Sequence, residues 1–257
     1  MKSNRSIYRL LLCAGLVCNL ATAQSVPPAQ GTPLTQAGIP LHSGTSQPKY
    51  TPEPFKWLSK AEEQALADAV PPPPAPNSVE DQADLAAILE AQKTRTPEIA
   101  AESKRDQGFS YKLFQSVYGN DLTPENSPKF HLLMRHVLDA TGFVNGTAKG
   151  KYRRLRPYQG HPDVVTSLFI VGGFSYPSGH SMASFTLAVV LGSIFPDKQQ
   201  AFLDCAGRIA ESRVNAGVHY PSDIKEGELL GKATAAAILA NPSFQKDMAE
   251  VRTELKK

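Results

Sequence analysis

The chain is poor in cysteine. Only three of its 257 residues are cysteine, and two of them, Cys13 and Cys18, lie in an N-terminal segment that we expect to be removed. The remaining one, Cys205, has no partner for an intramolecular disulfide. Because it lies on an apolar stretch with helical spacing, we expect it to be a small buried hydrophobic residue.

Three further features are missing. No segment after Asn77 alternates β-branched residues over a length sufficient for a sheet. The apolar stretches that follow His180 and Asp223 are shorter than the roughly 20 residues of a membrane span, and they end in charged residues. The histidines outside the blocks described below lack the spacing of metal ligands. We therefore predict no sheet, no stable membrane insertion and no metal.

An excess of charge of one sign is also missing. The chain has 27 Lys and Arg against 24 Asp and Glu, and the difference of three equals the basic residues of the N-terminal segment, Lys2, Arg5 and Arg9. A neutral chain offers no broad basic surface to nucleic acid or to an anionic membrane. We therefore expect no nucleic-acid partner, and any functional positive charge must be local.

Residues 1–23 have the pattern of a secretory signal peptide. The three basic residues precede a short apolar core over residues 10–20, and Ala21-Thr22-Ala23 supplies the small residues of a cleavage site. The apolar core is too short to be a membrane anchor. We expect export to the periplasm and a mature chain that begins near Gln24.

Proline dominates the next segment. Residues 24–77 hold twelve of the 21 prolines, interrupted by a helix-like piece over residues 57–70. Such a composition cannot nucleate a core. We predict a Pro-rich extension that wraps around or tethers a domain over residues 78–257, so that a chain starting near Pro76 should fold.

After Asn77, apolar residues recur with the period of a helix. The clearest helix begins at Ser127-Pro128 and is expected to end at Gly142. Similar patterns predict helices over the following ranges: 79–93, 97–118, 179–195, 199–215, 221–240 and 242–255. The sequence thus predicts an all-α fold, with a single domain of six to eight helices.

Reactive side chains are concentrated in three short blocks: Lys149 with Arg156-Pro157, then Pro177-Ser178-Gly179-His180, then Ser212-Arg213 with His219 and Asp223. Two arginine forks and one lysine point charge suit a phosphoryl group with three equatorial oxygens. We therefore predict that Lys149, Arg156 and Arg213 bind phosphate. Their basic neighbours are expected to form an ordinary solvated surface: Lys151, Arg153 and Arg154.

The second and third blocks have the patterns of helix starts. A turn precedes an apolar helix at Gly179, so the Ser178 hydroxyl and the Gly179 N–H are expected to bind phosphate oxygens there. Pro221 fits the first turn of a later helix and places Asp223 where its carboxylate can reach one nitrogen of His219. The other nitrogen would then face phosphorus as a nucleophile.

The order and spacings of these blocks resemble the signature K-x6-R-P, P-S-G-H, S-R-x5-H-x3-D of the type 2 phosphatidic acid phosphatase superfamily, with eleven identities. Roughly residues 78–257 are most similar to the class A bacterial non-specific acid phosphatases. The resemblance implies a helical domain of the kind shared with vanadium haloperoxidases. It also implies that His180 is the general acid, with His219 as nucleophile and Asp223 as its orienting carboxylate.

The activity implied is that of a metal-independent acid phosphatase, which hydrolyses phosphomonoesters through a phosphohistidine intermediate. No cofactor is expected, and vanadate should inhibit by imitating the pentavalent transition state. The expected partner is a small-molecule phosphomonoester. The resemblance also admits a homo-oligomer.

Other functions stay open at this stage. A vanadate-dependent haloperoxidase would use the same residues, with vanadate attached to His219, although such chains are generally much longer. A phosphatase of lipid or pyrophosphate substrates also fits, because nothing in the sequence identifies the leaving group. A non-catalytic phosphate-binding protein should lack one of the two histidines of the blocks, and both are present.

Overall fold

A computed structural model describes residues 56–256, and this part of the chain is helical without a β-strand. The predicted signal peptide, residues 1–23, and the predicted extension up to residue 55 lie outside the described residues. The longer helices are α1 (Lys60–Asp68), α2 (Val79–Thr94), α3 (Pro97–Arg105), α5 (Pro128–Tyr152), α7 (Gly179–Ile194), α8 (Gln199–Asn215), α9 (Pro221–Ala240) and α10 (Pro242–Glu254). Shorter pieces are the 3₁₀ helices η1 (Tyr111–Phe114) and η2 (Pro196–Lys198) and the helices α4 (Gln115–Tyr118) and α6 (Pro157–Gly160). The all-α prediction is confirmed.

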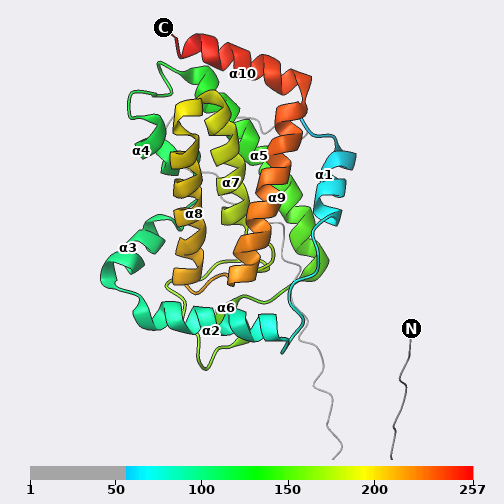
Figure 1. Cartoon of the computed structure of the whole chain (residues 1–257), viewed down its shortest axis with the longest axis vertical. Coiled ribbons are helices and arrows are strands. Elements are labelled where there is room, and N and C mark those ends of the chain that lie inside the picture. The colour runs from blue at the N-terminus through cyan, green and yellow to red at the C-terminus, as the bar shows by residue number, and fades with distance from the viewer. Residues whose placement is uncertain (1–55, 257) are drawn as a thin grey trace, which may run out of the picture. The chain divides into compact units, whose positions relative to one another are not determined.

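Helix α7 forms the centre of the domain. Twelve of its sixteen residues are buried, and it packs against α5, α8 and α9 (Figure 1). A helix that is apolar all round is typical of the middle of a bundle. Gly227 of α9 allows a close approach, because a Cβ at this position would lie 2.5 Å from the carbonyl oxygen of Ser178.

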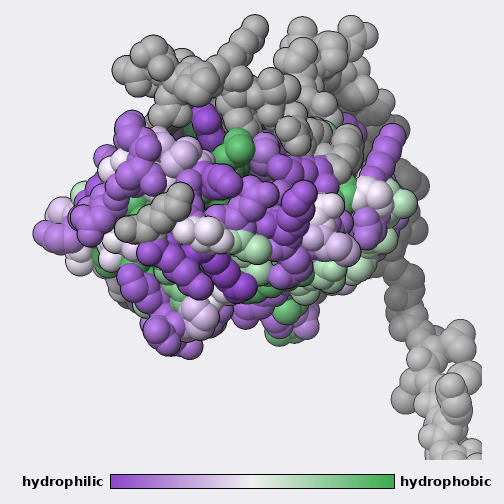
Figure 2. Space-filling view, turned by 90° about the horizontal axis from the view of Figure 1, so that it is seen from above, coloured by the Kyte–Doolittle hydropathy of each residue, from purple (hydrophilic) through white to green (hydrophobic). Residues whose placement is uncertain are grey.

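The surface at the α10 end of the domain is mostly hydrophilic, with apolar residues interspersed (Figure 2). Helix α10 turns Phe244, Met248 and Val251 inward, one or two turns apart, so its other sides face solvent. Within residues 56–256, no helix combines the length and the apolar composition needed to cross a bilayer.

Helix α5 is longer than predicted. Gly142 was expected to end it, but the helix continues to Tyr152, where Arg153 terminates it in the left-handed conformation with φ of 52°. Val144 and Ala148 extend its buried face. The packing of that face outweighs the roughly 1 kcal/mol that a glycine costs inside a helix. The longer helix places Lys149 in the last turn of α5.

The helix predicted over residues 97–118 is broken. Helix α3 ends at Arg105, and helical structure resumes only at η1. At the break, the carbonyl oxygen of Asp106 accepts a hydrogen bond from Arg213 at 3.0 Å, and the His180 ring lies 3.1 Å from the same oxygen. These tertiary bonds replace helical ones, and the predicted continuous helix is therefore wrong.

Residues 57–70 pack onto the helical domain. The Trp57 side chain is buried, and its ring meets Phe244 edge-on with centroids 4.9 Å apart. The carbonyl oxygen of Val70 accepts a hydrogen bond from the Tyr152 hydroxyl at 2.6 Å. The predicted domain boundary at residue 77 stays a prediction, but the last part of the extension contributes side chains to the core.

Candidate active site

The three sequence blocks meet at one end of the bundle, where α5 and α8 end and α7 and α9 begin (Figure 1). Lys149 lies in the last turn of α5 and Arg213 in the last turn of α8. His180 is the second residue of α7, and Asp223 lies in the first turn of α9. Gly179 is the first residue of α7, and the other predicted residues lie on the connections next to these helix ends: Arg156, Ser178 and His219.

The turn between α8 and α9 places His219. Helix α8 ends at Asn215 and α9 begins at Pro221, as predicted. Between them Gly217 has a φ of 70°, and a Cβ there would lie 2.8 Å from the carbonyl oxygen of Thr166. Only glycine fits this conformation and this space without strain, so the sharp turn follows directly from the sequence.

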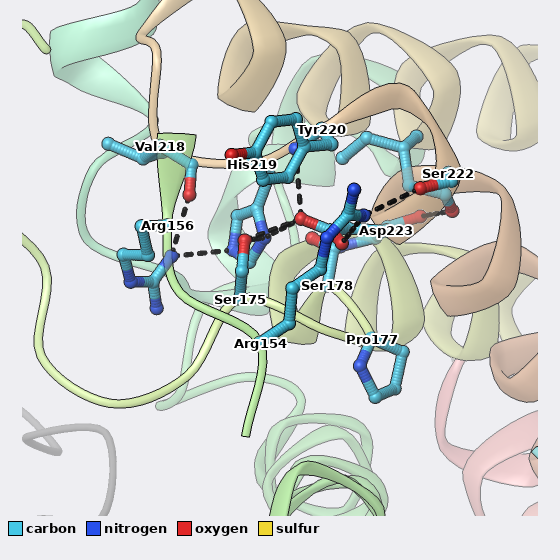
Figure 3. A network of polar contacts seen from close by, with 12 residues as sticks. Arg154, Arg156, Ser175, Pro177, Ser178, Val218, His219, Tyr220, Ser222 and Asp223 are labelled. Carbon is cyan, nitrogen blue, oxygen red and sulfur yellow. Dashed lines mark hydrogen bonds and ion pairs between the residues drawn. The ribbon is translucent and has the colours of Figure 1, made fainter. Parts of the chain in front are cut away.

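His219 lies between a carboxylate and a guanidinium (Figure 3). Its Nδ1 is 3.3 Å from Oδ2 of Asp223, and its Nε2 is 3.0 Å from Nη1 of Arg156. Because a guanidinium can only donate, Nε2 accepts and carries no proton. The single proton of the neutral ring therefore lies on Nδ1, facing the carboxylate. This is the tautomer that a nucleophilic Nε2 requires.

The surroundings of His219 keep its imidazole neutral. Burial lowers its pKa well below the ordinary value, and the positive charges of Arg156, Lys149 and Arg213 lower the pKa further. A neutral ring offers a lone pair for attack. The electrostatics and the tautomer thus point to the same chemical property, an unprotonated Nε2 next to a group of cations.

The three predicted phosphate-binding cations are hydrogen-bonded to backbone carbonyls. Lys149 donates to the carbonyl oxygens of residues 174, 175 and 177, at 2.8, 3.1 and 2.6 Å. Arg156 donates to Gly172 at 2.9 Å and to Val218 at 2.8 Å. Arg213 donates to one carbonyl oxygen, while its buried Nε has no hydrogen-bond partner within residues 56–256. We call these three residues the cation cluster.

The members of the cation cluster disfavour one another's charge. Burial, followed by the charge of Arg156, lowers the pKa of Lys149 to about 7. The same two causes lower the pKa of Arg213 to about 10. Like charges that are held together in a buried place attract an anion strongly, since an anion relieves both their repulsion and their desolvation.

His180 lies beside the cation cluster at the start of α7. Its Nε2 is 3.1 Å from the carbonyl oxygen of Asp106 and 3.2 Å from that of Gln107. Carbonyl oxygens only accept, so Nε2 carries a proton. Burial lowers the pKa of His180 well below its ordinary value, and the charge of Arg213 adds to this effect.

Ser178 and Gly179 form the N-terminus of α7. The Ser178 hydroxyl oxygen caps this helix by accepting from the Ser181 N–H at 3.3 Å, which leaves the hydroxyl hydrogen able to donate to another group. A Cβ at Gly179 would lie 2.8 Å from Nδ2 of Asn145 on α5. The close packing of α5 on this turn therefore favours glycine at this position.

Arg154 does not lie on the solvated surface that was predicted for it. Lys151 and Arg153 are exposed as expected, but the side chain of Arg154 is only 9% exposed and its Nη1 donates to Asp223 Oδ1 at 2.9 Å. Exposure alternates along the segment after α5, so that Arg153 and Leu155 are exposed while Arg154 lies inward like the buried Arg156. No sequence signal indicates this burial, because the apolar residue of the segment, Leu155, lies on the exposed side.

Ser175 is a second residue that the sequence did not reveal. Its hydroxyl donates to Asp223 Oδ2 at 2.5 Å and lies 3.4 Å from Nδ1 of His219. The side chain is fully buried. A serine two residues before a Pro-Ser-Gly turn carries no pattern that distinguishes it from an ordinary loop residue.

Several known proteins are similar to this chain. Residues 132–247 match the family described as the PAP2 superfamily. A non-specific acid phosphatase from Providencia stuartii is 25% identical over 256 residues, which cover 96% of each chain. Another from Salmonella typhi is 28% identical over 197 residues, covering 72% of this chain and 78% of the relative. Residues 132–247, which contain all three blocks of the site, are therefore assigned to the PAP2 superfamily.

Two solved structures share the fold. A bacterial vanadium-dependent iodoperoxidase has a TM-score of 0.54 and 16% identity, covering 70% of this chain and 53% of its own, so the present chain spans about half of that protein. A transmembrane PAP2-type phosphatidylglycerolphosphate phosphatase from Bacillus subtilis has a TM-score of 0.50 and 23% identity, covering 72% and 92%. At these identities the likeness shows the fold alone.

Proposed function

We propose that this protein is a metal-independent acid phosphatase that hydrolyses small phosphomonoesters through a phosphohistidine on His219. One observation carries the proposal: Nδ1 of His219 faces Asp223 while the unprotonated Nε2 faces Arg156. An unprotonated nitrogen directed at a group of cations suits in-line attack on a phosphoryl group that is bound there. The names of the relatives from P. stuartii and S. typhi support the same class of reaction.

The ester binds by exchanging hydrogen-bond partners at the cation cluster. Phosphate oxygens replace backbone carbonyls as acceptors, because a charged acceptor forms a stronger bond to guanidinium or ammonium than a neutral one. The Ser178 hydroxyl and the Gly179 N–H add donors from the N-terminus of α7. Binding therefore needs small movements of Lys149, Arg156 and Arg213 rather than a rearrangement of helices.

Hydrolysis takes two displacements. In the first, Nε2 of His219 forms a bond to phosphorus as the bond from phosphorus to the ester oxygen breaks, and His180 gives its proton to the departing oxygen. In the second, His180 takes a proton from water, whose oxygen bonds to phosphorus as the phosphorus–nitrogen bond breaks. Phosphate leaves, and both histidines return to their starting protonation states.

His180 must gain a proton before it can act as the acid. Burial and the charge of Arg213 lower its pKa in the free protein, so the ring is neutral at neutral pH. A phosphate dianion has the opposite effect and raises this pKa. We therefore infer that acidic conditions and substrate binding together supply the protonated His180.

The remaining sequence predictions complete the proposal. The signal-like pattern of residues 1–23 supports export to the periplasm. The equal numbers of acidic and basic residues beyond it support a small-molecule substrate rather than nucleic acid.

Phosphate release from a panel of substrates tests the proposal. The panel contains aryl phosphate, nucleotide, sugar phosphate, pyrophosphate and a phosphatidate, each with and without EDTA, and with vanadate as inhibitor. We expect hydrolysis of the soluble monoesters that survives EDTA and is inhibited by vanadate. Activity that EDTA abolishes and a divalent metal restores would contradict metal independence. Halide oxidation with vanadate and peroxide, without phosphate release, would replace the phosphatase by a haloperoxidase.

A further inference from the structure

Arg154 is the centre of a buried ionic cluster next to His219. Its Nη1 donates to Asp223 Oδ1 at 2.9 Å and to the Ser222 hydroxyl at 2.7 Å. Its Nη2 donates to Asp84 at 2.9 Å and to Asp81 at 3.1 Å. Asp223 and Ser222 belong to the first turn of α9, whereas Asp81 and Asp84 belong to α2. One guanidinium therefore joins two helices that are far apart in the sequence.

The two oxygens of Asp223 have separate sets of partners (Figure 3). Oδ1 is bonded to Arg154. Oδ2 accepts from the Ser175 hydroxyl at 2.5 Å and from the Tyr220 N–H at 2.8 Å, and it faces Nδ1 of His219 at 3.3 Å. A carboxylate that is bonded at both oxygens cannot turn, and the orientation of the His219 ring depends on it.

Arg154 supports this carboxylate in two further ways. Its backbone carbonyl accepts from the Ser175 N–H at 2.8 Å, which positions the serine that bonds Oδ2. Its guanidinium lies over the Tyr220 ring, 3.9 Å from the centroid. The main chain of Arg154 thus positions the serine that bonds Oδ2 of Asp223, and its side chain bonds Oδ1.

Arg154 is the cation in direct contact with the carboxylate of Asp223. The carboxylate is fully buried, and a buried carboxyl group without a cation tends to become neutral. A neutral carboxyl group could donate a proton toward Nδ1 of His219, and the ring would then carry its own proton on Nε2, where attack should occur. Arg154 is bonded directly to Asp223 and opposes this change.

The second helix fixes Arg154 in turn. Asp84 accepts from the Ser222 N–H at 3.0 Å and from the Ser222 hydroxyl, in addition to Arg154. Helix α2 lies across the end of the bundle that carries the site (Figure 1). Asp84 therefore ties α2, Arg154 and the start of α9 into one unit.

Stability alone is a poor reason for such a cluster. Desolvation largely offsets the attraction within buried ion pairs, so their net contribution to folding is small. Here one of the three carboxylates is the partner of His219. We propose that Arg154 is a positioning residue that holds the carboxylate of Asp223 in place as the hydrogen-bond acceptor of His219 Nδ1, and thereby keeps His219 in its Nδ1-protonated tautomer. The kinetic part of this inference rests on the proposed function, whereas the tautomer does not.

The tautomer of His219 provides the direct test. Full-length Arg154→Gln protein, labelled with ¹⁵N-histidine, is compared by NMR with wild type and with Arg153→Gln. Arg153 is a matched control because it is the adjacent arginine, is exposed, and places its guanidinium near the Phe174 ring. We expect the Nδ1-protonated form in wild type and in Arg153→Gln, and a shift toward the Nε2-protonated form in Arg154→Gln.

Kinetics on an aryl phosphate provide the second measurement. Loss of a residue that orients a reacting group indirectly typically lowers activity by about 10–100-fold. We expect a fall of this size in kcat for Arg154→Gln, with KM and inhibition by inorganic phosphate nearly unchanged, because the cation cluster is intact. Arg154→Lys should lose less, since it keeps the charge but not the fork.

Several results would overturn the inference. These are an unchanged His219 tautomer in folded Arg154→Gln, a rise in KM without a fall in kcat, or an equal loss in Arg153→Gln. If Arg154→Gln does not fold, Arg154→Lys and Asp84→Asn take its place under the same criteria. A wild-type protein without phosphatase activity would refute the proposed function, while the NMR comparison would still decide the role of Arg154.

Discussion

The two nitrogens of His219 face regions that differ in how completely the chain satisfies them. On the Nδ1 side, Asp223 is bonded at both oxygens, and one of them accepts from Arg154. On the Nε2 side, the cation cluster is bonded to neutral carbonyls, and Nε of Arg213 has no partner within residues 56–256. The first region is complete within the protein, whereas the second has positive charge without a matching anion.

This difference separates orientation from binding. A region whose hydrogen bonds and charges are already satisfied holds its geometry when a ligand arrives. A region with spare positive charge gains from an anion, since neutral acceptors are replaced by charged ones. Substitutions on the Nδ1 side should therefore change the rate of chemistry, and substitutions on the Nε2 side should change affinity as well.

The largest effect is expected from the histidine that joins the two regions. His219→Ala should lower kcat/KM by about 10⁴-fold or more, as removal of a nucleophile does, and His180→Ala should be nearly as inactive. A radiolabelled ester with a good leaving group distinguishes them. His180→Ala should acquire acid-labile phosphate, because attack by His219 needs little leaving-group protonation, whereas His219→Ala should not. Label on His180 in the His219→Ala protein would reverse the two roles.

The contrast between the regions is tested most directly by Asp223→Asn against Arg156→Gln. The amide at residue 223 disturbs the His219 tautomer but leaves the cation cluster in place, so kcat should fall by about 10³–10⁴-fold with a small change in phosphate affinity. Loss of Arg156 removes a phosphate donor, so the inhibition constant for inorganic phosphate should rise as well. If Asp223→Asn and Arg156→Gln lowered kcat and phosphate affinity in the same proportion, the distinction between the two regions would be wrong.

Changes in the segment over residues 57–70 should affect the stability of the protein more than they affect the site. Removing a buried tryptophan costs about 3–5 kcal/mol, so Trp57→Ala should lower the free energy of unfolding by that amount. A chain starting at residue 77 should be destabilised further, in contrast to the expectation from composition. Urea unfolding of both proteins, beside a chain starting at residue 56, provides the measurement. Unchanged stability of the chain from residue 77 would restore the composition-based boundary.

The smallest effect concerns pH. A lowered pKa keeps His219 neutral and able to attack well below its ordinary value near 6.5, so the acid limb of kcat/KM should lie well below pH 6.5. As pH rises past about 7, Lys149 loses its charge in the free protein, and affinity for a phosphate dianion should decline. The pH profile should therefore be a bell with an acidic optimum. A flat profile from about pH 5 to about pH 9 would contradict these assignments.

Local sequence was sufficient to predict most helix ends near the site. Asn215, Gly217 and Pro221 act within a few residues of themselves, so the end of α8 and the start of α9 follow from short-range sterics. The extension of α5 past Gly142 did not follow, because the cost of one glycine is local whereas the gain comes from packing against α7. The break after Arg105 was missed for the same reason, since its hydrogen bonds involve Arg213 and His180.

The residue types and spacings of the three blocks alone defined the chemical character of the site: cations for an anion, a histidine with a carboxylate four residues later, and a helix start. Such spacings are short enough for helix and turn geometry to bring the groups together. Only the folded arrangement determines that Arg154 is buried against Asp84 and Asp223, about 70 residues away on either side. Ion pairs between residues so far apart in the sequence depend on how α2 and α9 pack. The residues next to an arginine in the sequence do not indicate that packing.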